Sequence, residues 1–163
     1  MQRFIVRCRP LSIMCASLLL FLCMACALPA AARDYRRFFI GDRDLPTPGQ
    51  VVPGLLLAGG GDRNLDAMRW FLGRAGNGHI VVLSGSYTTE LADEFYRDVG
   101  AAASVETFVF KNGKPANDPK ILASLARADG IFIAGGDQAR YVRYWKGTPV
   151  AEALDAHVRA GKP

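Results

Sequence analysis

The chain has 163 residues, with 20 Lys and Arg against 15 Asp and Glu, and a net charge of +5. Three of the basic residues and none of the acidic ones precede position 33, so the rest of the chain carries only +2, which gives no support to nucleic-acid binding. All four cysteines also precede position 33. The remainder therefore cannot form a disulfide, a thiolate metal site or a cysteine nucleophile.

Residues 1–32 have the pattern of an export signal. Three arginines, at positions 3, 7 and 9, come before an apolar run from about Leu11 to Leu28, and Ala30–Ala32 offers a small-residue cleavage site. A membrane-spanning anchor and a lipid-modified Cys26 remain as alternatives. The pattern predicts a protein exported to the periplasm or the extracellular space, without stable membrane association after cleavage.

The mature chain divides into a lead-in segment and an α/β region. Residues 33–50 are polar and contain Pro46, Pro48 and Gly49, and residues 51–163 alternate between apolar runs and helical patterns. Strands are predicted for four apolar runs, the third of them as an outer strand: Gly54–Ala58, Ile80–Leu83, Val105–Phe110 and Ile131–Ala134.

Helices are predicted between these strands from their starting and stopping residues. Asn64 caps a helix that carries Leu65, Met68, Phe71 and Leu72, and Thr88 or Thr89 starts another that ends at Gly100. Asp118-Pro119 and Thr148-Pro149 each combine a capping residue with a proline at the first helical position. A short helix is expected over Tyr141–Trp145.

The alternation predicts a doubly wound parallel sheet with helices on both faces. Right-handed crossovers allow the strand order 3-2-1-4, with a fifth strand beyond Pro163, so we expect a C-terminally truncated domain whose fourth strand is an apolar edge. In this order the chain reverses between the first and fourth strands. The loops at Gly59–Gly61 and Gly135–Gln138 should then meet at one crevice.

Several motifs in the sequence have ordinary structural explanations. Asn64 occupies the third glycine position of a dinucleotide fingerprint, and no acidic residue ends the second strand, so we expect no nucleotide cofactor. Ser84 and Ser86 lack the flanking glycines of a nucleophile elbow and are expected in a turn. The two histidines, His79 and His157, have no acidic neighbours at metal-binding spacing, so no metal site is expected.

The turn Gly135-Gly136-Asp137-Gln138 is the strongest candidate for a functional site. A tight turn alone would account for its glycines. However, a carboxylate and a carboxamide at the mouth of the crevice suit the recognition of amide or amino groups. A glycine N–H at the same place could stabilise an oxyanion.

Three segments of the chain together resemble the cyanophycinase family, which are serine peptidases related to aspartyl dipeptidase on a fold like that of class I glutamine amidotransferases. The segments run in order from Leu55 to Asp62, Ile80 to Ser84 and Ile131 to Gln138, and the last is the most specific. In that family a later strand carries the nucleophilic serine, followed by a histidine and an acidic partner. The resemblance implies that these residues lie beyond Pro163 and that the chain alone is inactive.

The resemblance also implies roles for residues of this chain. Gly135 and Gly136 would contribute to the oxyanion hole, and Asp137 and Gln138 would contact the substrate. Gly60 and Gly61 are also expected to contact the substrate, because their loop is predicted to meet this turn at the crevice. The substrate would be cyanophycin, an aspartate polymer bearing arginine side groups, or a related β-aspartyl peptide. The sequence leaves the oligomeric state open, a homo-oligomer included. The alternatives are an exported binding module of the same fold without catalysis and, with less support, a nucleotide-binding redox domain.

Overall fold

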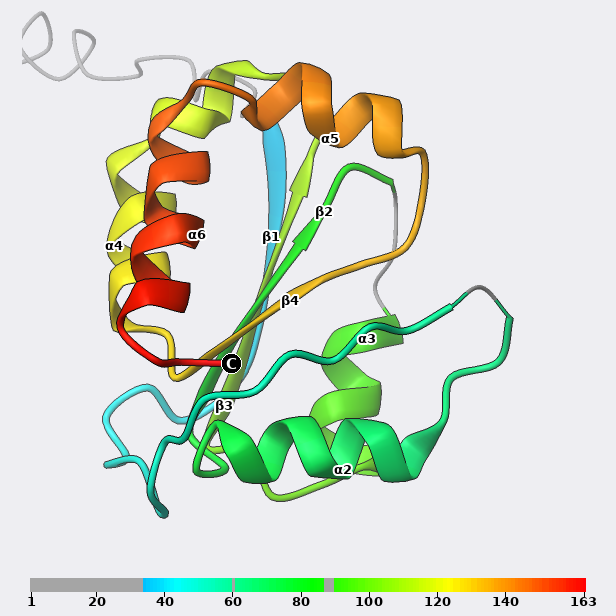
Figure 1. The fold of residues 1–163 in the computed structure, drawn as a ribbon, viewed down its shortest axis with the longest axis vertical. Helices are drawn as coiled ribbons and strands as arrows, with labels where there is room; N and C mark the ends of the chain where they lie inside the picture. The colour runs from blue at the N-terminus through cyan, green and yellow to red at the C-terminus, as the bar shows by residue number, and fades with distance from the viewer. Residues whose placement is uncertain (1–33, 60, 87–89) are drawn as a thin grey trace, which may run out of the picture. The chain divides into compact units, whose positions relative to one another are not determined.

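The computed structural model describes residues 34–59, 61–86 and 90–163 (Figure 1). The predicted export signal, all four cysteines and both candidate starting residues of the second helix, Thr88 and Thr89, lie outside this part. The elements in chain order are β1 (Tyr35–Gly41), α2 (Leu65–Arg74), β2 (His79–Ser84), α3 (Glu90–Asp93), the π-helix η1 (Glu94–Asp98), β3 (Ser104–Phe110), the 3₁₀ helix η2 (Lys114–Asn117), α4 (Pro119–Arg127), β4 (Gly130–Ile133), α5 (Gln138–Trp145) and α6 (Pro149–Arg159).

The described strands form one four-stranded sheet in the order β1-β3-β2-β4. β2 pairs in parallel with β3 and with β4, whereas β1 pairs antiparallel with β3. The α/β class is therefore as predicted, but the predicted order 3-2-1-4 is wrong. β3 is an inner strand rather than an outer one, because β1 covers its far edge.

The apolar run Gly54–Ala58, predicted as the first and central strand, lies outside the sheet. β4 pairs directly with β2 and occupies the edge that this run was expected to use. Leu56 still packs against the core, but Leu55 and Leu57 are 76% and 84% exposed. A continuous apolar run is compatible with a buried strand, and periodicity alone does not say which edge it finds.

The segment 33–50, predicted only as a polar lead-in, contains β1. Tyr35 is buried in the core, while Arg36 and Arg37 are exposed. Charged side chains are common on edge strands, where they discourage pairing with other chains. They also gave this segment its polar composition and concealed the strand.

Two of the predicted helix starts are capped as expected. The side chain of Asn64 accepts hydrogen bonds from the N–H groups of Asp66 and Ala67, and Asp118 accepts one from Lys120. Thr148 precedes α6 but makes no cap bond; its hydroxyl instead donates to the carbonyl of Trp145 at 2.7 Å. The proline at the first position of α6 favours the start of a helix there, because its fixed φ suits the helix and its missing N–H leaves no donor unpaired.

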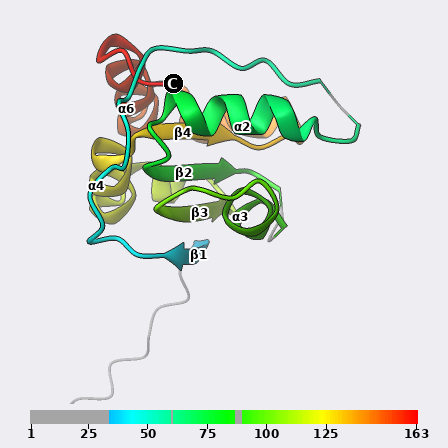
Figure 2. The same ribbon diagram turned by 90° about the horizontal axis from the view of Figure 1, so that it is seen from below.

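Helices cover both faces of the sheet (Figure 2). On one face, α2, α3 and η1 pack a core containing Met68, Phe71 and Phe95 against Ile80 and Val105. On the other face, α4, α5 and α6 pack a second core, whose members include Phe108, Phe110, Ile121, Leu125, Trp145 and Val150. No helix in the described part of the chain is long and apolar enough to cross a bilayer.

The imidazole of His157 on α6 is buried in this structure. Its Nε2 lies 2.9 Å from the carbonyl oxygen of Pro163. Burial lowers the pKa of His157 below 6.5, with a further lowering from Lys162, while the Pro163 carbonyl and Asp129 act in the opposite direction. The folded state therefore favours the neutral imidazole.

We expect His157 to make stability fall with acidification. Because the folded-state pKa is below the unfolded value, the contribution of His157 is complete above about pH 6.5 and is lost as the pH falls through that value toward the folded pKa. His157→Gln removes this titration and keeps a side-chain N–H for the Pro163 carbonyl. Melting temperatures measured from pH 8 to pH 5 should fall more steeply for the wild type than for the variant, and parallel curves would contradict the assignment.

Candidate functional site

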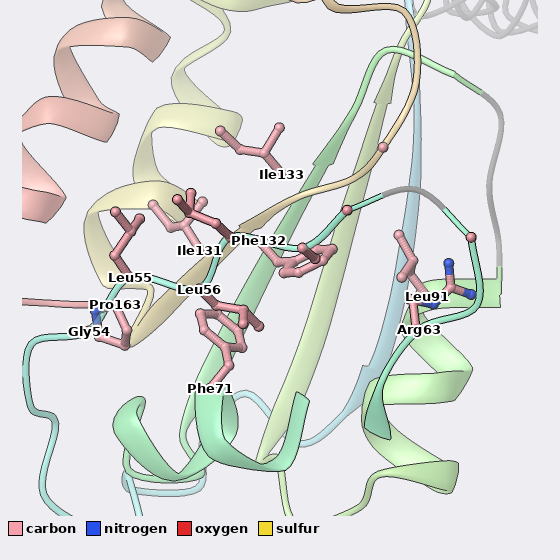
Figure 3. Close-up of a pocket in the computed structure, with 15 residues that line it drawn as sticks. Gly54, Leu55, Leu56, Arg63, Phe71, Leu91, Ile131, Phe132, Ile133 and Pro163 are labelled. Atoms are coloured by element: carbon pink, nitrogen blue, oxygen red, sulfur yellow. The ribbon is translucent and has the colours of Figure 1, made fainter. Parts of the chain in front are cut away.

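A cavity of about 540 Å³ lies between the segment that precedes α2 and the exposed edge of β4 (Figure 3). Residues 54–59, Gly61 and Arg63 line one side, and Ile131, Phe132, Ile133 and Gly135 line the other. The cavity is of the size that holds a small molecule or a short peptide segment. Pro163 also lines the cavity, and its carbonyl accepts a hydrogen bond from the Ile131 N–H at the outer edge of β4.

The floor of the cavity is apolar. Phe71 from α2 and Phe132 from β4 stand at its centre, with ring centroids 5.9 Å apart (Figure 3). Among the described residues, Arg63 alone brings a charged side chain to the cavity lining. It forms an ion pair with Glu94 of η1. Polar recognition in this cavity therefore depends largely on backbone groups.

The turn that follows β4 supplies such groups. Ala134 continues the pairing with β2 through an N–H to the Leu83 carbonyl, and the chain then turns at Gly135 and Gly136. Within the described residues, nothing accepts a hydrogen bond from either glycine N–H. Gly136 has a φ of +146°, a conformation that favours glycine.

Tyr141 of α5 fixes this turn. Its hydroxyl lies 2.7 Å from the Ala134 carbonyl oxygen and 3.0 Å from that of Gly135. A phenol has one proton, so the two carbonyls share a single donor. The sequence predicted Tyr141 only as a helical aromatic, although its position in the first turn of the helix that follows the glycines is a usable signal for contact with them.

Asp137 and Gln138 lie outside the cavity lining. Asp137 is the N-cap of α5, and its carboxylate accepts a hydrogen bond from the N–H of Ala139 at 2.9 Å. Arg140 lies 3.7 Å from the same carboxylate. Gln138 begins α5 with an exposed side chain. Their contact with a substrate stays a prediction.

The two glycine-rich loops contribute jointly to the cavity. Gly59 and Gly61 line it together with Gly135, although the run before Gly59 is not in the sheet. Gly61 has a φ of +99°, which explains a glycine at this position. Gly60, predicted to bind substrate, lies outside the described residues.

The serines and histidines for which the sequence predicted no catalytic or metal-binding role make hydrogen bonds outside the cavity. Ser84 donates its hydroxyl to the Ser86 carbonyl and accepts from the Ser86 N–H, which is a turn role. The ring of His79 lies between the Ser104 hydroxyl and the Leu45 carbonyl oxygen. The described residues contain no group of three His, Cys, Asp or Glu side chains placed to hold a metal ion.

The comparisons with known proteins relate this chain to one enzyme family. No family model matches the chain. Curated cyanophycinases of Trichormus variabilis and of Nostoc sp. are each 27% identical to it over 129 residues, which cover 73% of this chain and 43% of the relative. The chain thus spans less than half the length of these relatives, and at this identity the similarity supports a distant, cyanophycinase-like relationship.

Proposed function

We propose that this chain forms the amino-terminal part of a peptidase-like hydrolase that acts on cyanophycin or on related β-aspartyl peptides. The observation that carries the proposal is the similarity to two cyanophycinases over most of the chain. The cavity beside β4 supports it: Gly135 lines this cavity, and within the described residues nothing accepts a hydrogen bond from the N–H of Gly135 or of Gly136.

In this proposal the Gly135-Gly136 turn has the role of an oxyanion hole. A serine oxygen adds to the carbonyl carbon of the scissile amide, the carbonyl oxygen gains the negative charge, and a glycine N–H stabilises it. The base that took the serine proton passes it to the amide nitrogen, which leaves as an amine, and water then hydrolyses the serine ester and regenerates the hydroxyl. Asp137 and Gln138 bind polar groups of the substrate, and Gly60 and Gly61 approach its backbone.

The proposal places the nucleophile outside these residues. No serine or histidine lines the cavity within the described part of the chain. The relatives are more than twice as long as the matched region, which leaves room for a nucleophile strand and its base. The sheet is then extended beyond β4, as in class I glutamine amidotransferases.

We also propose that the protein is exported and that residues 1–32 are removed. Export places the hydrolase where it meets polymer released by other cells. Amino-terminal sequencing of protein recovered outside the cytoplasm should begin near Arg33, and an intact Met1 on cytoplasmic protein would contradict this.

The test of the proposed activity uses protein that extends to the length of the relatives, with the 163-residue chain as a control. We expect the longer protein to release soluble arginine-containing products from cyanophycin or to cleave a β-aspartyl dipeptide, and the shorter chain to release none. If the longer protein sediments with the polymer but releases nothing, the protein is a binding module. If it neither binds nor cleaves either substrate, the proposal fails.

A further inference from the structure

A second cavity, of about 370 Å³, lies between β1, β3 and α4. It shares no lining residue with the cavity beside β4. Four cationic side chains line it, and a single carboxylate accompanies them: the set is Arg37, Arg43, Lys120 and Arg127 with Glu106. The net charge of this lining is strongly positive, although the chain as a whole beyond position 32 is nearly neutral.

One stripe of α4 forms a wall of this cavity. Lys120, Ala123, Ser124 and Arg127 stand at positions i, i+3, i+4 and i+7, so they lie along the same side of the helix. Ile121 and Leu125, on the adjacent side, are buried against the sheet. Burial of that side thereby fixes the direction in which the basic stripe faces.

Glu106 organises the opposite wall. Its side chain is 8% exposed and accepts hydrogen bonds from Arg37 Nε at 2.5 Å and from Arg43 Nη2 at 3.2 Å. The Arg43 guanidinium also lies 4.7 Å from the ring centroid of Phe39, which pairs with Glu106 across the two strands. One carboxylate thus holds two arginines in place and leaves them with further N–H donors.

In the part of the chain that the structure describes, the α4 cations lack acidic partners. Within the described residues no carboxylate lies in ion-pair range of Lys120 or Arg127, and Arg127 makes only a long bond of 3.4 Å to the Arg43 carbonyl. The Ser124 hydroxyl, between them, has no hydrogen-bond partner among these residues. Concentrated positive charge with unused donors favours a ligand that carries several negative charges.

We propose that this cavity binds a small, multiply charged oxyanion, either a phosphate compound or a compound with clustered carboxylates. Arginines oriented by Glu106 form one side of the site, and Lys120, Ser124 and Arg127 form the other. Arginine matches both phosphate and carboxylate oxygens through paired N–H donors, and lysine adds a point charge. The proposal does not rest on the proposed peptidase function, because no residue is common to the two cavities.

Titration calorimetry of the purified protein with pyrophosphate and with citrate tests this, in buffers adjusted with KCl to equal ionic strength. We expect saturable binding of at least one probe. Tighter binding of pyrophosphate identifies a phosphate ligand, and tighter binding of citrate identifies a carboxylate ligand. Absence of saturable binding by either probe overturns the proposal.

Paired double variants separate a site from general charge attraction. Lys120→Gln with Arg127→Gln should weaken binding at least tenfold. Arg143→Gln with Lys146→Gln removes the same charge from exposed positions at the end of α5, away from the cavity, and should leave the affinity within about twofold. Thermal melts confirm that both proteins are folded. If the two double variants lose affinity equally, the binding is non-specific and the proposal is wrong.

Discussion

Gly136→Val should lower kcat/KM for cyanophycin by about 100-fold or more in the proposed hydrolase. The φ of +146° at Gly136 is strained for a β-branched residue, and a Cβ atom would lie 2.7 Å from Ser86 Oγ and 3.1 Å from the Tyr141 hydroxyl oxygen. Relief of this crowding displaces Tyr141, which fixes the carbonyls of the turn. The loss of one oxyanion donor typically costs about 10²–10³ in rate.

Gly135→Ala is the matched control for this effect. A Cβ atom at Gly135 meets nothing within 4 Å, and the φ there is not positive. We therefore expect a loss of less than about tenfold, with the N–H group retained. Both variants are assayed on the same substrate together with their melting temperatures. If Gly136→Val and the wild type are equally active, the turn does not belong to the catalytic site.

Features set by neighbouring residues could be predicted from the sequence. Asn64 and Asp118 cap their helices as expected, because a side-chain oxygen and an N–H two or three residues later interact without any distant partner. The second strand and the strand before the Gly135-Gly136 turn also lie within a residue of their predicted bounds. Their apolar runs are short and are bounded by turn residues.

The order of the strands depends on distant pairing, and there the prediction was wrong. Gly54–Ala58 and Gly130–Ile133 are both short apolar segments, and nothing in either shows which one pairs with β2. The antiparallel β1 was missed because its residues are separated from β3 by more than 60 positions and include two arginines. The side chain that pairs with Arg37 is Glu106, far along the sequence.

The candidate site was predictable only where neighbouring residues determine it. Glycines that follow apolar runs indicated the loops at Gly61 and Gly135, and both line the cavity. Arg63 precedes α2 and its partner Glu94 begins η1, 31 positions later, so no sequence pattern relates them. The basic cavity was likewise invisible, since its residues come from β1, β3 and α4 and meet only after folding.

Phe95→Ala should be the most destabilising of the substitutions considered. Phe95 is 1% exposed, and its ring centroid lies 6.0 Å from that of Phe71 and 5.1 Å from that of Phe132. Its removal leaves a void among rings that belong to α2, η1 and β4, and a buried Phe→Ala change typically costs about 3–5 kcal/mol. Because domains of this kind are stable by only about 5–15 kcal/mol, the urea midpoint should fall sharply.

Leu57→Ala provides the contrast, because it also removes an apolar side chain but from a position that is 84% exposed. Its effect on the free energy of unfolding should stay within about 0.5 kcal/mol. Phe71 and Phe132 form the cavity floor, so the void left by Phe95 lies directly behind it. If Phe95→Ala and Leu57→Ala unfold at similar urea concentrations, the aromatic cluster does not hold the helices to this face of the sheet, and the floor of the cavity is not a rigid surface.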